Sequence, residues 1–137
     1  MYSKIFGLLF AVVFVIVLPL LAVTTQSSGR PAETAIAGQL VCMACELKAG
    51  EGARAACGEF GHNYGLKTTD GKFLGFLENR YSKDLIAGEK YKDKDLVIHG
   101  HHHIAANLID VESFDVDGLK ISWCSHCRAM DSCNAHK

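Results

Sequence analysis

Cysteine is the residue type in this sequence whose spacing points most directly to chemistry. The 137 residues contain six cysteines, and four of them form two Cys-x-x-Cys pairs, Cys42 with Cys45 and Cys124 with Cys127. A pair of thiolates separated by two residues is a common half of a tetrahedral zinc site, so two such pairs predict one four-thiolate metal site. The pairs are about 80 residues apart, so this site requires the two ends of the domain to lie together.

Two other uses of the cysteines agree with the same spacing. In an oxidising compartment an even number of cysteines favours disulfides, which would make the chain a stapled interaction domain. The sequence Trp-Cys-Ser-His-Cys at 123–127 is also similar to the dithiol of thioredoxin-like oxidoreductases, where the first cysteine begins a helix. Only ten residues follow Cys127, too few for that surrounding fold, so a catalytic dithiol of Cys124 and Cys127 is the third alternative.

A second group of potential ligands lies in the sequence Val-Ile-His-Gly-His-His-His at 97–103. His99, His101 and His103 alternate, and in an extended strand alternate side chains point to one side, about 7 Å apart. Two imidazoles at that spacing can share one metal ion, whereas packing gives no reason for so many neighbouring histidines. We therefore predict that these three histidines contact a metal, with an exposed polar loop as the alternative. His62 stands alone in a turn-rich segment and is expected to be structural.

The donor types narrow the choice of metal. Thiolates favour Zn²⁺ or Cu(I), and imidazoles also suit Cu(II) and Ni²⁺. The predicted cofactor is thus Zn²⁺ or copper. Zn²⁺ is the safer expectation outside the cytoplasm, because a thiol site there must be kept from oxidation.

Composition and motifs argue against several other functions. The formal net charge is −1 and the sequence has no basic stripe, so we expect no nucleic-acid partner. The sequence lacks Gly-x-Ser-x-Gly, His-Glu-x-x-His and the phosphate-binding loop. The acidic residues between 110 and 117 alternate with apolar ones and are expected on the solvent side of a strand. A binding protein is therefore favoured over an enzyme.

The first 29 residues predict export. One lysine, Lys4, precedes an uncharged apolar run at 5–23, which is the layout of a secretory signal. The run is longer than most cleaved signals and close to a membrane span, so residues 1–29 are either a signal peptide or an inner-membrane anchor. The protein is then periplasmic or extracellular. A protein partner is expected there, and membrane contact only through the uncleaved segment.

The remaining residues must position the ligands. Residues 30–35 are expected to form a linker, 36–123 a β-barrel and 124–137 a cysteine-rich tail. Asp-Gly pairs at 70–71 and 117–118 predict two tight turns between strands.

One short helix is expected between Ser82 as its N-cap and Gly88 as its stop. The glycine-rich segment after the first cysteine pair reads as loop, with one or two helical turns at most at 53–60. Together, about five to six short strands with this helix after the third predict a mainly β fold, a small closed or half-closed barrel.

The order of these elements resembles that of small exported OB-fold proteins of bacteria. The resemblance covers residues 36–122 and rests on the motifs Gly-Leu-x-Thr-x-Asp-Gly-Lys, Ser-x-Asp-Leu-Ile-x-Gly, Lys-x-Leu-Val-Ile-His-Gly and Ile-Asp-Val-x-Ser-Phe. It implies an OB-like barrel and an extracytoplasmic location. The activity of such proteins is largely unassigned, so the resemblance implies little about chemistry. Many OB barrels bind nucleic acid through a basic, aromatic face, and this chain lacks the basic half of that face.

The sequence thus predicts an exported OB-like barrel that binds a transition metal for sequestration, for delivery or as a structural site. The residues predicted to ligate the metal are Cys42, Cys45, Cys124, Cys127, His99, His101 and His103.

Overall fold

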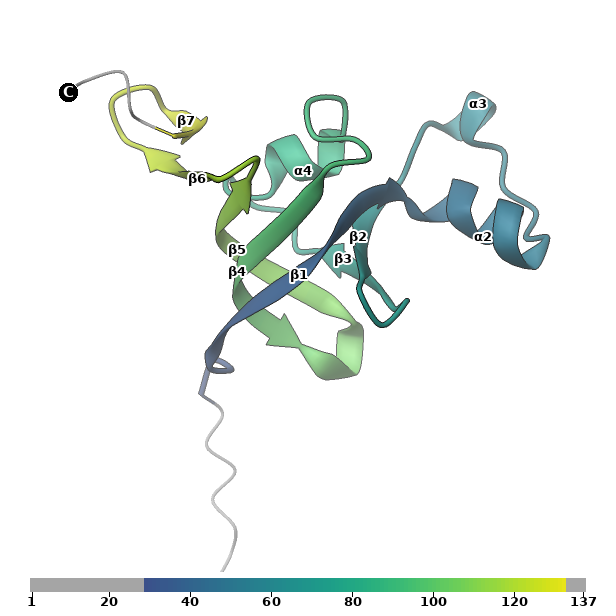
Figure 1. Ribbon diagram of the computed structural model, residues 1–137, viewed down its shortest axis with the longest axis horizontal. Coiled ribbons are helices and arrows are strands. Elements are labelled where there is room, and N and C mark those ends of the chain that lie inside the picture. The colour runs from purple at the N-terminus through teal and green to yellow at the C-terminus, as the bar shows by residue number, and fades with distance from the viewer. Residues whose placement is uncertain (1–28, 133–137) are drawn as a thin grey trace, which may run out of the picture.

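Five strands close into a barrel in the computed structural model, which describes residues 29–132 (Figure 1). They are β1 (Glu33–Cys42), β2 (Tyr64–Thr68), β3 (Phe73–Phe76), β4 (Asp95–His103) and β5 (Leu108–Val116). β1 lies between β2 and β4, β3 pairs with β2, and β5 pairs with β4, all antiparallel. A parallel pairing of β3 with β5 closes the ring. The mainly β fold class is confirmed, and the strand order is compatible with an OB-like fold.

Two further strands extend the sheet beyond the barrel. β6 (Leu119–Cys124) pairs with β5, and β7 (Ala129–Asp131) pairs with β6 to form a terminal hairpin. The tight turn between β5 and β6 is the predicted Asp-Gly turn. Asp117 and Gly118 both adopt positive φ, 51° and 78°, as a type I′ turn requires.

Short helices occupy the connections between strands. The β1–β2 connection carries α2 (Met43–Glu51) and α3 (Cys57–Phe60), where the sequence indicated mainly loop. α4 (Lys83–Ala87) lies between β3 and β4, and a 3-10 helix, η2 (Ile104–Ala106), lies between β4 and β5. α4 begins after Ser82 and ends before Gly88, as the sequence predicted. The Ser82 side chain does not cap it, because its buried Oγ donates to the carbonyl of Leu77 at 2.6 Å.

The barrel interior is filled by apolar residues that alternate with outward-facing polar ones along the strands, as period-2 patterning requires. Phe114 is at its centre and meets the Tyr91 ring edge to face, with centroids 5.0 Å apart. The fully buried core residues on the strands are Leu40, Leu66, Ile98, Ile109, Val111 and Phe114.

The start of the domain differs from the expected linker. β1 begins at Glu33, and Arg30 forms ion pairs with Asp110 at 2.7 Å and with Glu112 at 3.1 Å. This part of the chain is therefore attached to β5. Among residues 29–132, no helix is long and apolar enough to cross a membrane. The predicted export segment and the end of the tail, with Cys133, lie outside the described residues.

Candidate metal centre

Four potential metal ligands meet in the connection between β1 and β2. They are Cys42, Cys45, Cys57 and His62, and their ligand atoms all lie within 4.8 Å of one another. Their spacing in the sequence is C-x2-C-x11-C-x4-H. We call residues 43–63, which join the two strands and carry three of these ligands, the insert.

The strands fix the two ends of this cluster. Cys42 is the last residue of β1 and pairs with Tyr64, the first residue of β2. The backbone N–H of Met43 donates to the carbonyl of Asn63 at 2.9 Å, which continues the ladder by one step. Because the insert leaves and rejoins the barrel at one point, Cys42 at its beginning and His62 at its end are held side by side.

The two helices of the insert bring the remaining thiols to that point. Cys45 lies in the first turn of α2, and Cys57 is the first residue of α3. The Tyr64 ring packs beside His62, with ring centroids 5.7 Å apart. Gly88 also lies against the Tyr64 ring, where a Cβ atom would stand 2.0 Å from it, so the end of α4 supports the residue beside the cluster.

The distances fit a tetrahedral metal site. The Cys57 sulfur is 3.7 Å from that of Cys42 and 3.3 Å from that of Cys45. Nδ1 of His62 lies 3.7 Å from the Cys45 sulfur. A tetrahedral zinc ion with Zn–S bonds of about 2.3 Å holds its sulfurs about 3.8 Å apart, close to the observed separations. A disulfide has sulfurs at about 2.0 Å, and Cys42, Cys45 and Cys57 are free thiols.

The thiols share one negative charge unequally. Burial raises the pKa of the Cys42 thiol, but hydrogen bonds from Cys45 and His62 outweigh it, and the pKa falls to about 6. Backbone N–H groups of Cys45 and Asn63 add to this lowering. The pKa of Cys45 is raised to about 12, first because its thiol donates to Cys42 and then because it donates to Cys57. One thiolate is thus stabilised by its neighbours, and a cation would be needed to hold all three.

Ala44, Cys45 and Cys57 pack against the core while partly buried, and few other contacts hold the insert in place. Neither α2 nor α3 contains a fully buried residue. An ion pair between Glu46 and Lys67 at 2.6 Å, with both side chains well exposed, connects α2 to β2. The Met43 sulfur lies against the barrel, where a Cβ at Gly65 would meet it at 2.4 Å. The Met43 sulfur therefore anchors α2 on β2.

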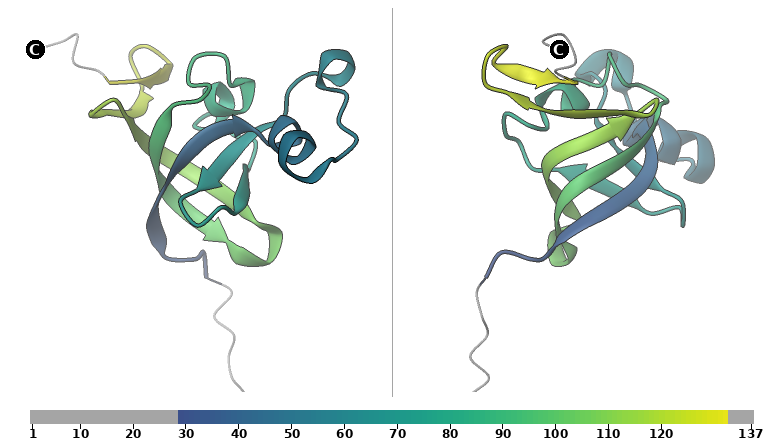
Figure 2. Two further views of the ribbon diagram at one scale, coloured as in Figure 1. Left: turned by 45° about the vertical axis from the view of Figure 1, so that its right-hand side comes forward. Right: turned by 60° about the vertical axis from the view of Figure 1, so that its left-hand side comes forward.

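The second predicted cysteine pair lies elsewhere. Cys124 ends β6 and Cys127 lies in the turn before β7, and this hairpin lies on the opposite side of the barrel from α2 and α3 in Figure 1 and in the left view of Figure 2. The sheet order explains the separation, because β4 and β5 stand between β1 and the terminal hairpin. The two Cys-x-x-Cys pairs are not brought together, and the predicted four-thiolate site is not the arrangement of this structure. Metal ligation by Cys124 and Cys127 stays a prediction.

The predicted histidine ligands lie on β4. Two of them, His99 and His101, contact carboxylates of β5. Nε2 of His99 lies 2.8 Å from a carboxylate oxygen of Asp115. Nε2 of His101 lies 3.1 Å from Glu112, and its Nδ1 contacts the carbonyl of Pro31. His103 ends the strand opposite Leu108. Among residues 29–132 these histidines belong to no group of three or more converging ligands, and metal contact by them stays a prediction.

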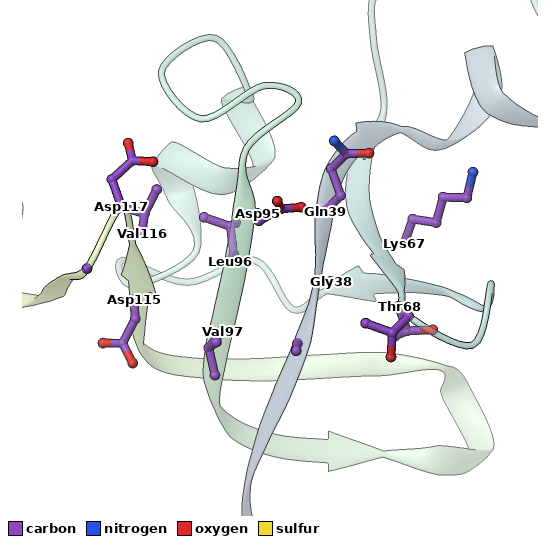
Figure 3. Close-up of a pocket in the computed structure, with 13 residues that line it drawn as sticks. Gly38, Gln39, Lys67, Thr68, Asp95, Leu96, Val97, Asp115, Val116 and Asp117 are labelled. Carbon is purple, nitrogen blue, oxygen red and sulfur yellow. The ribbon is translucent and has the colours of Figure 1, made fainter.

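A surface cleft of about 590 Å³ lies over strands β1, β2, β4 and β5 (Figure 3). Figure 3 shows Asp115 and Asp117 from the end of β5 on one side, Lys67 and Thr68 from β2 on the other, and Gly38 between them. Two of its carboxylates already have partners, since Asp117 pairs with Lys94 at 2.9 Å and Asp115 contacts His99. No cysteine or histidine lines the cleft, and its polar lining consists of carboxylates together with Gln39, Lys67 and two threonines.

Sequence reasoning missed Cys57 and assigned His62 to a structural role. The signal that could have found them was position, because both fall in the same connection as Cys42 and Cys45. A short loop brings its own residues together at a lower entropic cost than a segment about 80 residues away. Comparison with family models, with curated proteins and with solved structures found no match for the chain.

Proposed function

We propose that this protein is an exported metal-binding barrel whose insert folds around one Zn²⁺ ion held by Cys42, Cys45, Cys57 and His62. One observation carries the proposal: three sulfur donors, from β1, α2 and α3, and one imidazole, from the segment before β2, converge within 4.8 Å. Thiols this close together cannot all ionise unless a cation neutralises them, and the raised pKa of Cys45 reflects this. The metal would fix the insert on the barrel, and the surface of the insert would bind a protein partner.

The donor set favours zinc over copper. Three thiolates and one imidazole in a tetrahedral arrangement form a recognised type of structural zinc site, in which the protein fills all four positions. Zn²⁺ has no redox chemistry that would oxidise the thiolates. Cu(I) prefers thiolate and thioether ligands, but the nearest thioether, that of Met43, is packed against Gly65. A site with all positions filled supports a structural or sequestering role.

The proposal also includes export and a protein partner. The apolar run at 5–23 supports a periplasmic or extracellular location, with or without retention in the inner membrane. The insert offers Phe60, 82% exposed on α3 between Cys57 and His62, as a contact for a protein partner. Fractionation of cells that produce the full chain tests the first point. Full-length protein in the cytoplasmic fraction would contradict export.

Metal content tests the site. Protein purified anaerobically with reductant should contain zinc in an amount that Cys57→Ser lowers by about one ion per chain. Glu59→Gln is the matched control, because Glu59 lies two residues away in α3, is exposed, and is no member of the cluster. Its zinc content should equal that of the unmodified chain. Equal zinc in the Cys57→Ser protein would contradict the site.

A further inference from the structure

The terminal hairpin repeats the Cys-x-x-Cys spacing in a different setting. β6 ends at Cys124, residues 125–128 form the turn, and Cys127 stands in that turn. The hairpin projects from the barrel on the side away from α2 and α3 (Figure 1). The cluster in the insert therefore does not account for this second pair.

The turn has the geometry of a thiolate-binding knuckle. The backbone N–H of Cys127 donates to the Cys124 sulfur at 3.4 Å. Such a bond favours the ionised sulfur, and the thiolate is the form that binds metals. Arg128, the next residue, has φ 53°, which is uncommon for a residue other than glycine. This conformation costs free energy, and strained residues of this kind often occur at functional sites.

The barrel holds the base of this turn firmly and leaves its tip open. Cys124 is 8% exposed and Met130, across the hairpin, is 4% exposed. Trp123 packs edge to face on Tyr81 with centroids 6.1 Å apart, and the guanidinium of Arg80 lies 5.1 Å from its ring. Cys127 is exposed. A metal ion at the turn would thus have one sulfur fixed by the fold and one that solvent reaches.

We propose that Cys124 and Cys127 form a second metal site, separate from the insert and specific for thiolate-preferring transition-metal ions. Two thiolates leave coordination positions open for further donors, and the sequence places His126 in the same turn. An exposed site at a chain end exchanges its ion more readily than one closed by four ligands. The protein would then hold one structural ion and one exchangeable ion.

The only tryptophan of the chain, Trp123, adjoins Cys124 and serves as a local reporter. The full chain, reduced and free of metal, is titrated with Co²⁺ alone, which quenches the fluorescence of a nearby tryptophan. Quenching of Trp123 should saturate in the unmodified protein and be lost in Cys124→Ser/Cys127→Ser. Cobalt bound per chain should fall from about two to about one in that variant. Ser125→Ala, in the same turn and without a thiol, is the control and should behave as the unmodified protein.

A second variant separates this proposal from the proposed function. Cys45→Ser/Cys57→Ser should lose the ion of the insert and keep the quenching of Trp123. If the insert binds no metal, that variant changes nothing, while the hairpin variant still loses its ion. Equal cobalt stoichiometry and equal quenching in the unmodified and Cys124→Ser/Cys127→Ser proteins would overturn the second site. Alkylation of protein taken from its native compartment that shows Cys124 or Cys127 in a disulfide would also overturn it.

Discussion

The insert and strand β4 both present potential metal ligands, but they present them in opposite ways. Where the insert meets β1, Cys42, Cys45, Cys57 and His62 face one another and have few other partners. On β4, His99 and His101 face outward from neighbouring positions and meet the carboxylates of β5. The histidines are the denser cluster in the sequence, whereas the cysteines are the denser cluster in space.

This difference shows what makes a group of ligands a site. A metal ion needs several donor atoms directed at one point, and a connection that returns to its starting place supplies that geometry. Residues on one strand point the same way without converging, since their Cβ atoms stand about 7 Å apart. A histidine already paired with a carboxylate also has to leave that partner before it can rearrange around an ion.

The largest effect should come from removing the metal. Chelation of the proposed zinc ion should unfold the insert, residues 43–63, while the strands of the barrel stay protected, because α2 and α3 bury no residue fully. Structural zinc contributes on the order of 10 kcal/mol of binding free energy at neutral pH, and losing it should cost several kcal/mol of stability. Amide hydrogen exchange of the chelated and zinc-loaded proteins measures both regions at once. Equal protection of the insert in the two states would remove the contrast between the insert and the barrel.

A smaller effect should come from the surface on which α2 rests. Gly65→Ala would place a methyl group 2.4 Å from the Met43 sulfur and 2.8 Å from the Leu74 carbonyl. We expect a destabilisation of about 1–3 kcal/mol and a weaker metal affinity, since Met43 lies between the two cysteines. Urea unfolding and competition with a zinc chelator measure the two effects.

Gly58→Ala is the matched control for that substitution. Gly58 lies in α3, its φ is not positive, and a Cβ there would meet nothing within 4 Å. Alanine also loses less conformational entropy than glycine, so stability should be unchanged or rise by about 0.5 kcal/mol. A loss as large as that of Gly65→Ala would mean that the insert tolerates no change at all, and packing on β2 would not be the cause.

The sequence predicted the strands better than the site. Asp117-Gly118 and the helix stop at Gly88 were found because each needs a positive φ that few residues adopt, and both glycines do. Those signals are local. The ligand set was predicted from the symmetry of two Cys-x-x-Cys pairs, and symmetry in a sequence does not report distance in the fold. Cys57 and His62 join the cluster because of where the insert returns to β2, which depends on the pairing of Cys42 with Tyr64.

The histidine strand should respond less than the insert. His99→Ala/His101→Ala removes the contacts with Asp115 and Glu112, and because both carboxylates are exposed, the two contacts together should cost only about 1 kcal/mol. Metal content of the purified protein should not change. Elemental analysis and urea unfolding of the double variant measure the two quantities. Loss of one bound ion would show that these histidines do ligate a metal, as the sequence predicted, and would end the contrast with the insert.

The smallest effect should come from an exposed charge pair that belongs to neither region. Asp70 accepts hydrogen bonds from Lys72, at 2.7 Å, and from the Thr68 hydroxyl in the β2–β3 hairpin, and these hold its pKa near 2, below its usual 3.8. The folded state thus favours the ionised carboxylate. The stabilisation is present above about pH 4 and is lost as the pH falls through 2.

Asp70→Asn should therefore lower the urea midpoint slightly at pH 6, and the difference from the unmodified chain should vanish near pH 2. Metal is first removed from both proteins with a chelator, so that the measurements at pH 6 and pH 2 compare the same metal-free state. The effect stays small because exposed ion pairs contribute little, and added salt should reduce it further. A difference that grows in acid would show that Asp70 stabilises the fold in its protonated form, contrary to the direction of its pKa. If Asp70→Asn lowered the free energy of unfolding as much as chelation does, an exposed ion pair would contribute as much stability as the converging ligands. The insert would then not be the main source of metal-dependent stability.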